Sequence, residues 1–133
     1  MMRSRELAVL ASAVVLLFAC GGATEPACQS AVTVAVTSST SPTSTSPTFT
    51  WTPHCSVGGL QVYEGRIDGE YPVWIIEART AGEGAGSPVV YGHAPFMMQE
   101  STGPTALVVG HSYRVTLVGV TGAEIGTRVF GYP

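Results

Sequence analysis

The residues of this chain that could take part in acid–base or nucleophilic chemistry are scattered along the sequence. The three histidines, His54, His93 and His111, stand far apart, and many of the serines and threonines fall in low-complexity stretches. An acyl-transfer triad needs a nucleophile beside a base, and the Gly-x-Ser-x-Gly turn that presents such a serine is absent. We therefore expect each histidine to be a loop or turn residue, and the sequence predicts no catalytic residues.

Four carboxylates are grouped more closely, around one predicted hairpin. They are Glu64, Asp68, Glu70 and Glu77. Paired carboxylates can hydrolyse glycosides, and oxygen ligands of this kind suit calcium. No Asp-rich loop of recognised spacing accompanies them, so we interpret the group as a solvated hairpin face. The sequence predicts neither a metal nor a cofactor.

The tetrapeptide Leu17-Phe18-Ala19-Cys20 is the most informative stretch of the chain. It closes an apolar run of 13 residues, Leu7 to Ala19, that follows Arg3 and Arg5. A membrane-spanning helix needs about 20 residues, whereas the core of a signal peptide needs about 7–15. The length of the run therefore favours a signal peptide over a permanent membrane helix.

This N-terminal pattern resembles a bacterial lipoprotein signal peptide. In that family the cysteine thiol is acylated and the chain is cut before it, which implies a signal peptide over residues 1–19 and Cys20 as the first mature residue. Gly21 replaces the aspartate that tends to retain such proteins at the inner membrane, which implies the outer membrane. An ordinary signal peptide cut after Ala19 is the alternative. We expect a cell-envelope protein held on a membrane by lipid, facing either the periplasm or the outside.

If Cys20 carries lipid, two cysteines are left. The compartment outside the inner membrane is oxidising, so we expect a disulfide between Cys28 and Cys55. Two buried free thiols are the alternative. A zinc site is a weaker interpretation, because Cys28, His54 and Cys55 lack a fourth ligand at a familiar spacing.

The composition of the mature chain narrows the possible partners. Residues 20–133 support one domain with a modest core. They contain no lysine, and they carry four arginines against eight acidic residues. Such a chain has no basic patch to neutralise phosphates, so it is not expected to bind nucleic acid or to be drawn to acidic lipid headgroups.

Alternating apolar and β-branched residues predict a series of short strands after a tether at residues 20–29. The predicted strands are 31–37, 49–52, 60–64, 73–78, 88–91, 113–117 and 127–132. Trp74 and Ile76 should face the core and Glu77 water, with a turn at Asp68-Gly69. The Ser/Thr/Pro stretch 38–47 predicts a loop, or a stretch with O-linked sugars, and residues 92–104 are expected to be irregular. About seven strands with no helical period predict a sandwich or small barrel over residues 30–133.

Two motifs in this region resemble a fibronectin type III or related immunoglobulin-like domain. The run from Phe49 to Pro53 is similar to the second strand of that family, whose tryptophan lies in the core. Leu107, followed six residues later by Tyr113 and then by alternating apolar residues, is similar to the tyrosine corner, in which the hydroxyl bonds to the backbone across the turn. The resemblance implies an antiparallel β-sandwich of about seven strands, with Leu107 capping the core, Tyr113 forming the corner, and Val115 and Leu117 facing inward.

The chain departs from the family pattern in two places. It has Gly110 where a proline often stands, and a long connection between Tyr91 and Leu107. Both departures leave the strand order open.

The irregular segment contains Phe96-Met97-Met98, a candidate partner-binding loop, because methionine and phenylalanine form adaptable apolar surfaces. Packing over the end of the sandwich is the alternative. Together the sequence predicts a lipid-anchored envelope protein with a non-catalytic binding or structural domain, whose partner is an envelope protein or a glycan. The alternative is an accessory carbohydrate- or small-ligand-binding module, which an exposed face with Tyr63, Tyr71 and Tyr91 would favour.

Overall fold

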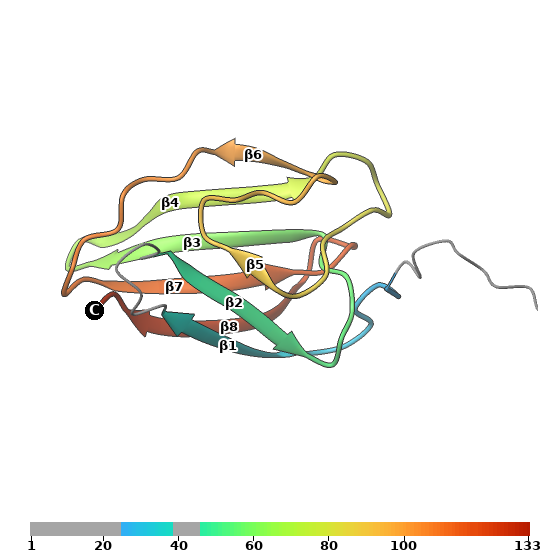
Figure 1. Ribbon diagram of the computed structural model, residues 1–133, viewed down its shortest axis with the longest axis horizontal. Helices are drawn as coiled ribbons and strands as arrows, with labels where there is room; N and C mark the ends of the chain where they lie inside the picture. Colours follow the sequence, from blue (N-terminus) through green and yellow to red (C-terminus); the bar gives the residue numbers. More distant parts are fainter. Residues whose placement is uncertain (1–24, 39–45) are drawn as a thin grey trace, which may run out of the picture.

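The computed structural model describes residues 25–38 and 46–133, and these residues form eight strands and no helix. The strands are β1 (Thr33–Ser38), β2 (Pro47–Thr52), β3 (Gly59–Arg66), β4 (Gly69–Ala78), β5 (Val89–Val90), β6 (Met98–Thr102), β7 (Ser112–Val118) and β8 (Glu124–Gly131). They build two antiparallel sheets, β1-β2-β5 and β6-β4-β3-β7-β8 (Figure 1). The predicted all-β class is confirmed. Within the described ranges, nothing has the helical length and apolar character needed to cross a membrane.

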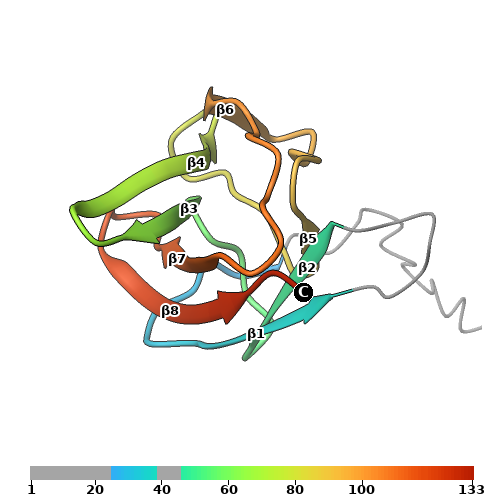
Figure 2. The ribbon, with the colours of Figure 1, turned by 90° about the vertical axis from the view of Figure 1, so that its left-hand side faces the viewer.

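The core lies between the two sheets, which form separate layers in Figure 2. Side chains alternate between the two faces of a strand, so every second residue of the predicted pattern points inward. Each large apolar side chain that is fully buried contributes about 1.5–3 kcal/mol relative to an exposed one. The buried apolar residues include Phe49, Trp51, Leu60, Val62, Trp74, Ile76, Val115 and Leu117. The inward positions predicted for these strands are therefore confirmed, and Glu77 is exposed as expected.

Aromatic rings join the two layers. The ring of Phe49 on β2 meets the ring of Phe130 on β8 edge to face, with 5.7 Å between centroids. The ring of Tyr113 on β7 stacks on the ring of Phe130, also with 5.7 Å between centroids. Such pairs contribute about 0.5–1.5 kcal/mol beyond the burial of their area.

The sheets approach most closely where β1 meets β8. The N–H of Val32 donates to the carbonyl oxygen of Ile125 over 2.9 Å. A Cβ atom at Gly126 would lie 2.9 Å from the carbonyl oxygen of Val32, which is closer than side-chain carbons come to backbone atoms. Glycine at position 126 therefore permits this close approach of the two strands.

Strand β6 corrects the prediction of an irregular segment over residues 92–104, and it raises the count from about seven strands to eight. It pairs with β4 at the edge of the larger sheet. Of its five residues only Met98 is buried, and residues 99–101 are all exposed. A strand at a sheet edge needs few buried residues. The polar run Gln-Glu-Ser-Thr therefore lacks the alternation of apolar and polar residues by which a strand is recognised in a sequence.

The predicted disulfide between Cys28 and Cys55 is present, with 4.8 Å between the two Cα atoms. Beside it, the N–H of Ser56 donates to the carbonyl oxygen of Pro26, and the N–H of Cys28 donates to that of Ser56, each over 2.9 Å. Residues 25–28 of the predicted tether are thus attached to the sandwich. We call the end of the sandwich that carries residues 25–28 and Ser56 the Cys28 end.

Other sequence predictions fall partly or wholly outside the described residues. Ser38 and Pro47, assigned to the Ser/Thr/Pro loop, pair with each other as the last residue of β1 and the first of β2. Residues 39–45 between them, and residues 1–24 with the signal peptide and Cys20, lie outside the described ranges.

Candidate functional site

An open groove of about 630 Å³ lies at the end of the sandwich opposite the Cys28 end. Residues 64–68, at the end of β3 and in its turn to β4, line one part of it, and residues 110–112, which lead into β7, line another. We call this end the Ile67 end, after the residue at the tip of the turn. Strand β3 has eight residues and separates the two ends by about 25 Å, given a rise of about 3.3 Å per residue.

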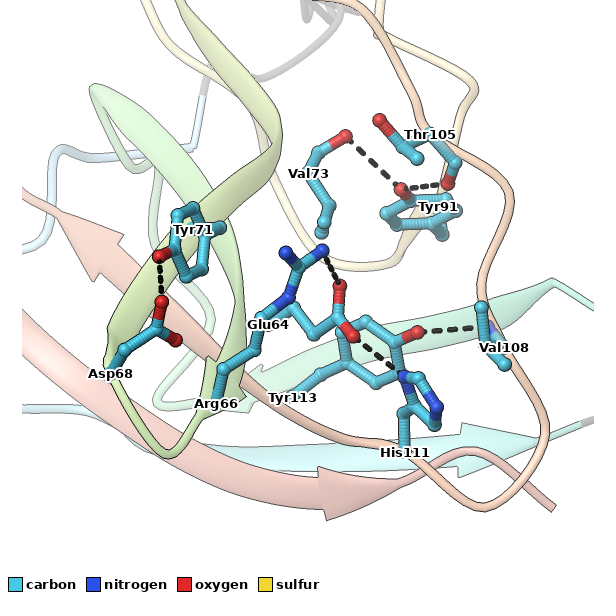
Figure 3. A network of polar contacts seen from close by, with 10 residues as sticks. All are labelled: Glu64, Arg66, Asp68, Tyr71, Val73, Tyr91, Thr105, Val108, His111 and Tyr113. Atoms are coloured by element: carbon cyan, nitrogen blue, oxygen red, sulfur yellow. Dashed lines mark hydrogen bonds and ion pairs between the residues drawn. The ribbon is translucent and has the colours of Figure 1, made fainter.

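Glu64 is the central residue of the groove. It follows Leu60 and Val62 at two-residue intervals, so the pleat of β3 turns its side chain toward the inner face, and it is only 6% exposed. Its Oε1 lies 2.6 Å from Nδ1 of His111, and its Oε2 accepts a hydrogen bond from Nη2 of Arg66 over 3.0 Å (Figure 3). Both carboxylate oxygens of this nearly buried acid are therefore paired.

These contacts keep Glu64 ionised. The hydrogen bond from Arg66, followed by that from His111, lowers the pKa of Glu64 below its usual value of 4.5, although burial acts in the opposite direction. A carboxyl group that serves as a general acid near neutral pH needs a raised pKa. Glu64 is instead suited to fixing the positions of Arg66 and His111.

Arg66 is held from a second side by Tyr71 and Asp68. Its guanidinium carbon lies 4.4 Å from the centre of the Tyr71 ring, which is a cation–π distance. The hydroxyl of Tyr71 donates in turn to Oδ2 of Asp68 over 2.6 Å (Figure 3), which lowers the pKa of Asp68 and raises that of Tyr71. Arg66 is thus a half-exposed cation with a fixed orientation beside the groove.

One exposed apolar side chain lines the groove, and two more lie in the loop that carries His111. Ile67 is fully exposed at the tip of the β3–β4 turn, and Val108 and Val109 are exposed in the loop before β7. Gly110 has a φ of +85°, a conformation that glycine adopts without strain, and it turns the chain so that His111 points toward Glu64 (Figure 3). A fixed guanidinium and an imidazole beside exposed aliphatic groups can bind a ligand that combines hydrogen-bond acceptors with an apolar part.

Acid should weaken the fold through Glu64. Because the pKa of Glu64 is lowered by folding, its ion pairs contribute stability at pH values above 4.5 and lose that contribution as the pH falls below it. Between about pH 5 and about pH 3, we expect Glu64→Gln to lose less stability than the parent, as measured by urea denaturation at each pH. Glu77→Gln, which alters an exposed carboxylate of the same hairpin, should follow the parent; identical acid slopes for all three proteins would contradict this role of Glu64.

Tyr113 makes the hydrogen bond expected at the corner. Its hydroxyl accepts from the N–H of Val108 over 2.8 Å (Figure 3). Leu107 is partly buried and packs against the core. Tyr113 is 1% exposed and sits at the start of β7. The bond fixes the loop that carries Val108 and His111 against the end of the sandwich.

Removing the Tyr113 hydroxyl should therefore destabilise the domain. We expect Tyr113→Phe to cost about 1–3 kcal/mol, because the N–H of Val108 loses its partner. Tyr63→Phe is the matched control, since the Tyr63 hydroxyl makes only a 3.4 Å contact with Gln61. Thermal unfolding of the two variants would decide, and equal melting temperatures would argue against the corner hydrogen bond.

The candidate loop Phe96-Met97-Met98 is divided by the start of β6. Phe96 is 86% exposed, Met97 is half-buried, and Met98 is buried among the core residues. Met98 therefore cannot belong to a partner-binding surface as predicted, because β6 directs its side chain inward. Phe96 and Met97 are left at the surface.

The three tyrosines considered for sugar stacking do not share one exposed face. Tyr91 is buried, and its hydroxyl contacts the carbonyl oxygens of Thr105 and Val73 at 2.6 and 3.2 Å (Figure 3). Burial raises the pKa of Tyr91 to about 12. Tyr63 is half-buried near Arg114, and Tyr71 is partly exposed beneath Arg66. The three tyrosines therefore do not together form a surface on which a sugar could stack.

The carboxylates of the hairpin form separate pairs, not one cluster. Glu70 pairs with Arg114, Asp68 with Tyr71, and Glu64 with Arg66 and His111. Among the described residues, no three potential metal ligands come together. The interpretation as a solvated face holds for Asp68, Glu70 and Glu77, which are exposed, but it is wrong for Glu64.

The link between Glu64 and His111 was missed in the sequence because 47 positions separate the two residues. The burial of Glu64 itself had a signal. Its position two residues after Val62, in a strand with inward Leu60, placed a charged side chain on the inner face. A charge at such a position needs a partner, and Arg66 on the same strand and His111 just before β7 fill that role.

No protein-family model, curated protein or solved structure matches this chain.

Proposed function

We propose that the protein is a lipoprotein of the bacterial cell envelope, anchored through Cys20 in the outer membrane, and that its folded domain is a non-catalytic binding module. The signal-peptide pattern that ends at Cys20 supports the anchor. The Cys28–Cys55 disulfide is in keeping with an oxidising compartment. Two or three acyl chains, each methylene contributing about 0.8 kcal/mol, would make the attachment effectively permanent.

We further propose that the domain is of the fibronectin type III kind. Strands β1, β2 and β5 share one sheet and β3, β7 and β8 share the other, as strands A, B, E and C, F, G do in immunoglobulin-like sandwiches. In this assignment β4 corresponds to C′, and β6 is an added edge strand. The hydrogen bond between Tyr113 and the backbone of Val108 supports the tyrosine corner.

The binding surface in this proposal is the groove at the Ile67 end. One observation carries it: the groove, with its fixed Arg66 and exposed Ile67, lies at the end of the sandwich opposite the residues nearest to Cys20. Such a surface is presented away from the anchor. End loops on a rigid sandwich are where binding residues are commonly found.

Two measurements test this function. Fractionation of cells should place the parent protein in the outer membrane, whereas Cys20→Ser, which can be neither acylated nor cut at this position, should not reach that membrane. A photo-reactive residue at position 67 should form a discrete adduct in intact envelopes, and the same residue at Thr33, which is exposed on β1, should not. A soluble parent protein would contradict the anchor, and equal adducts at both positions would contradict the binding surface.

A further inference from the structure

Phe96 is an exposed aromatic residue with no role in the fold or in the groove. It is 86% exposed in the short connection that leads into β6, and the half-buried Met97 follows it. A large aromatic side chain in water is unfavourable, and Phe96 does not line the groove that carries the exposed Ile67. Its position relative to the Cys28 end indicates what could cover it.

The strand register places Phe96 at the Cys28 end. Gly59 on β3 lies opposite Glu77 on β4, and Glu77 lies opposite Gln99 on β6. Gly59 and Gln99 are thus two strands apart, which corresponds to about 10 Å. Because β3 and β6 run in the same direction, the residues that precede each of them leave the sheet at the same end.

Hydrogen bonds continue this row beyond the strands. The N–H of Ala78 donates to the carbonyl oxygen of Gly58 over 2.9 Å, and the N–H of Arg79 donates to that of Met97 over 3.0 Å. Phe96 lies one residue beyond Met97, just as Val57 and Ser56 lie beyond Gly58. Phe96 and Ser56 therefore occupy the same end of the larger sheet, where β4 ends and β6 begins (Figure 1).

Ser56 also marks how close this end lies to Cys20. The hydroxyl of Ser56 donates to the carbonyl oxygen of Glu25, and its backbone binds Pro26 and Cys28. Only five peptide units connect Cys20 to Glu25. Fully extended, they span at most about 18 Å, so a lipid on Cys20 would hold Ser56 within about that distance of the bilayer.

We propose that the Cys28 end rests on the membrane and that Phe96 enters the lipid interface there. The proposal rests on the lipid anchor at Cys20. We take the partner to be a lipid surface, because the short connection from Cys20 to Glu25 keeps this end of the sandwich close to the bilayer. Aromatic side chains are favoured at the boundary between headgroups and acyl chains.

The charges at this end define the kind of contact. Arg79 is exposed, and its Nε donates to the carbonyl oxygen of Met98 over 3.1 Å. Two acidic residues, Glu77 on β4 and Glu83 in the segment that follows β4, offset its charge. The end is therefore not basic, and the contact depends on Phe96 and the anchor instead of on attraction to acidic lipids. The groove would then stand about the length of β3 above the membrane.

Tryptophan fluorescence in vesicles tests this orientation. The lipidated mature protein is reconstituted in phosphatidylcholine vesicles with or without brominated acyl chains, which quench tryptophans at the bilayer. Phe96→Trp places a reporter at the Cys28 end, and Ile67→Trp is the matched control at an exposed position of the other end. Trp51 and Trp74 are buried, so the parent protein gives the background to subtract.

We expect brominated lipid to quench most of the emission added by Phe96→Trp and to leave that of Ile67→Trp unchanged. Equal emission from Phe96→Trp in both kinds of vesicle, with the protein bound to them, would overturn the membrane contact alone. Flotation of the parent with the vesicles is measured first. If the parent does not float, the anchor fails and this inference fails with it.

Discussion

Met98→Asp should unfold the domain. Met98 is 1% exposed, and its side chain belongs to the core although its neighbours Gln99 and Glu100 are exposed. The substitution removes apolar contacts that are worth about 2–5 kcal/mol and places an unpaired carboxylate among apolar side chains, which adds a further penalty. A domain of this size has about 5–15 kcal/mol of total stability, so this loss consumes most or all of it.

Phe96→Asp is the matched control, because it introduces the same charge two positions earlier at an exposed site. Exposed substitutions of this kind change stability by about 0.5 kcal/mol or less. Urea denaturation followed by tryptophan fluorescence would compare the two variants with the parent. If Met98→Asp unfolded at the same urea concentration as Phe96→Asp, Met98 would not be a core residue and the placement of β6 would be wrong.

Removing the disulfide should have the next largest effect. The bond closes a segment between Cys28 and Cys55, which are 27 positions apart. In the chain-entropy model, a closed segment of this length contributes about 3–4 kcal/mol by restricting the unfolded chain. The double variant Cys28→Ser/Cys55→Ser should therefore lose about that much free energy of unfolding, with a clearly lower urea midpoint.

Reduction of the parent protein provides the control for this variant. The reduced parent and the double serine variant should show similar midpoints, because both lack the same covalent bond. A double variant as stable as the oxidised parent would show that the segment from 25 to 28 is held by its hydrogen bonds to Ser56 alone. Either result bears on the membrane contact, because this segment connects Cys20 to the sandwich.

Much of the fold could be predicted from the sequence where one face of a strand is buried. In β2, β3 and β7 the apolar residues recur at every second position, and each strand was located to within a few residues by this pattern. Strand β6 could not be found in this way. Its pairing with β4 depends on backbone hydrogen bonds at a sheet edge, which leave little trace in the side chains.

The groove at the Ile67 end was not predicted, because it depends on long-range pairing. Position 64 could be recognised as inward from Leu60 and Val62, but the sequence does not indicate that His111 lies opposite. That contact follows from the register in which Glu64 of β3 pairs with Tyr113 of β7. Register between distant strands is set by the packing of the whole sheet, and one sequence contains no local signal for it.

The two ends of the sandwich thus differ in a way that matches the proposed anchor. Residues near the N-terminus, the disulfide and Phe96 gather at the Cys28 end, and the paired Glu64, Arg66 and His111 lie at the other end with Ile67. A short link to a lipid would hold the Cys28 end against the bilayer, and the Ile67 end would then face away from it. Membrane attachment and ligand binding would then be separated along the length of β3.

Mass spectrometry of the N-terminal peptide tests the central claim most directly. Cleavage of the denatured and reduced protein after Arg66, the first arginine that follows Cys20, releases a peptide that begins at the mature N-terminus. The lipoprotein account predicts a peptide from Cys20 to Arg66 whose mass is increased by acyl chains on Cys20. A peptide with an unmodified Cys20 thiol, or one that still contains residues of the 1–19 segment, would contradict it.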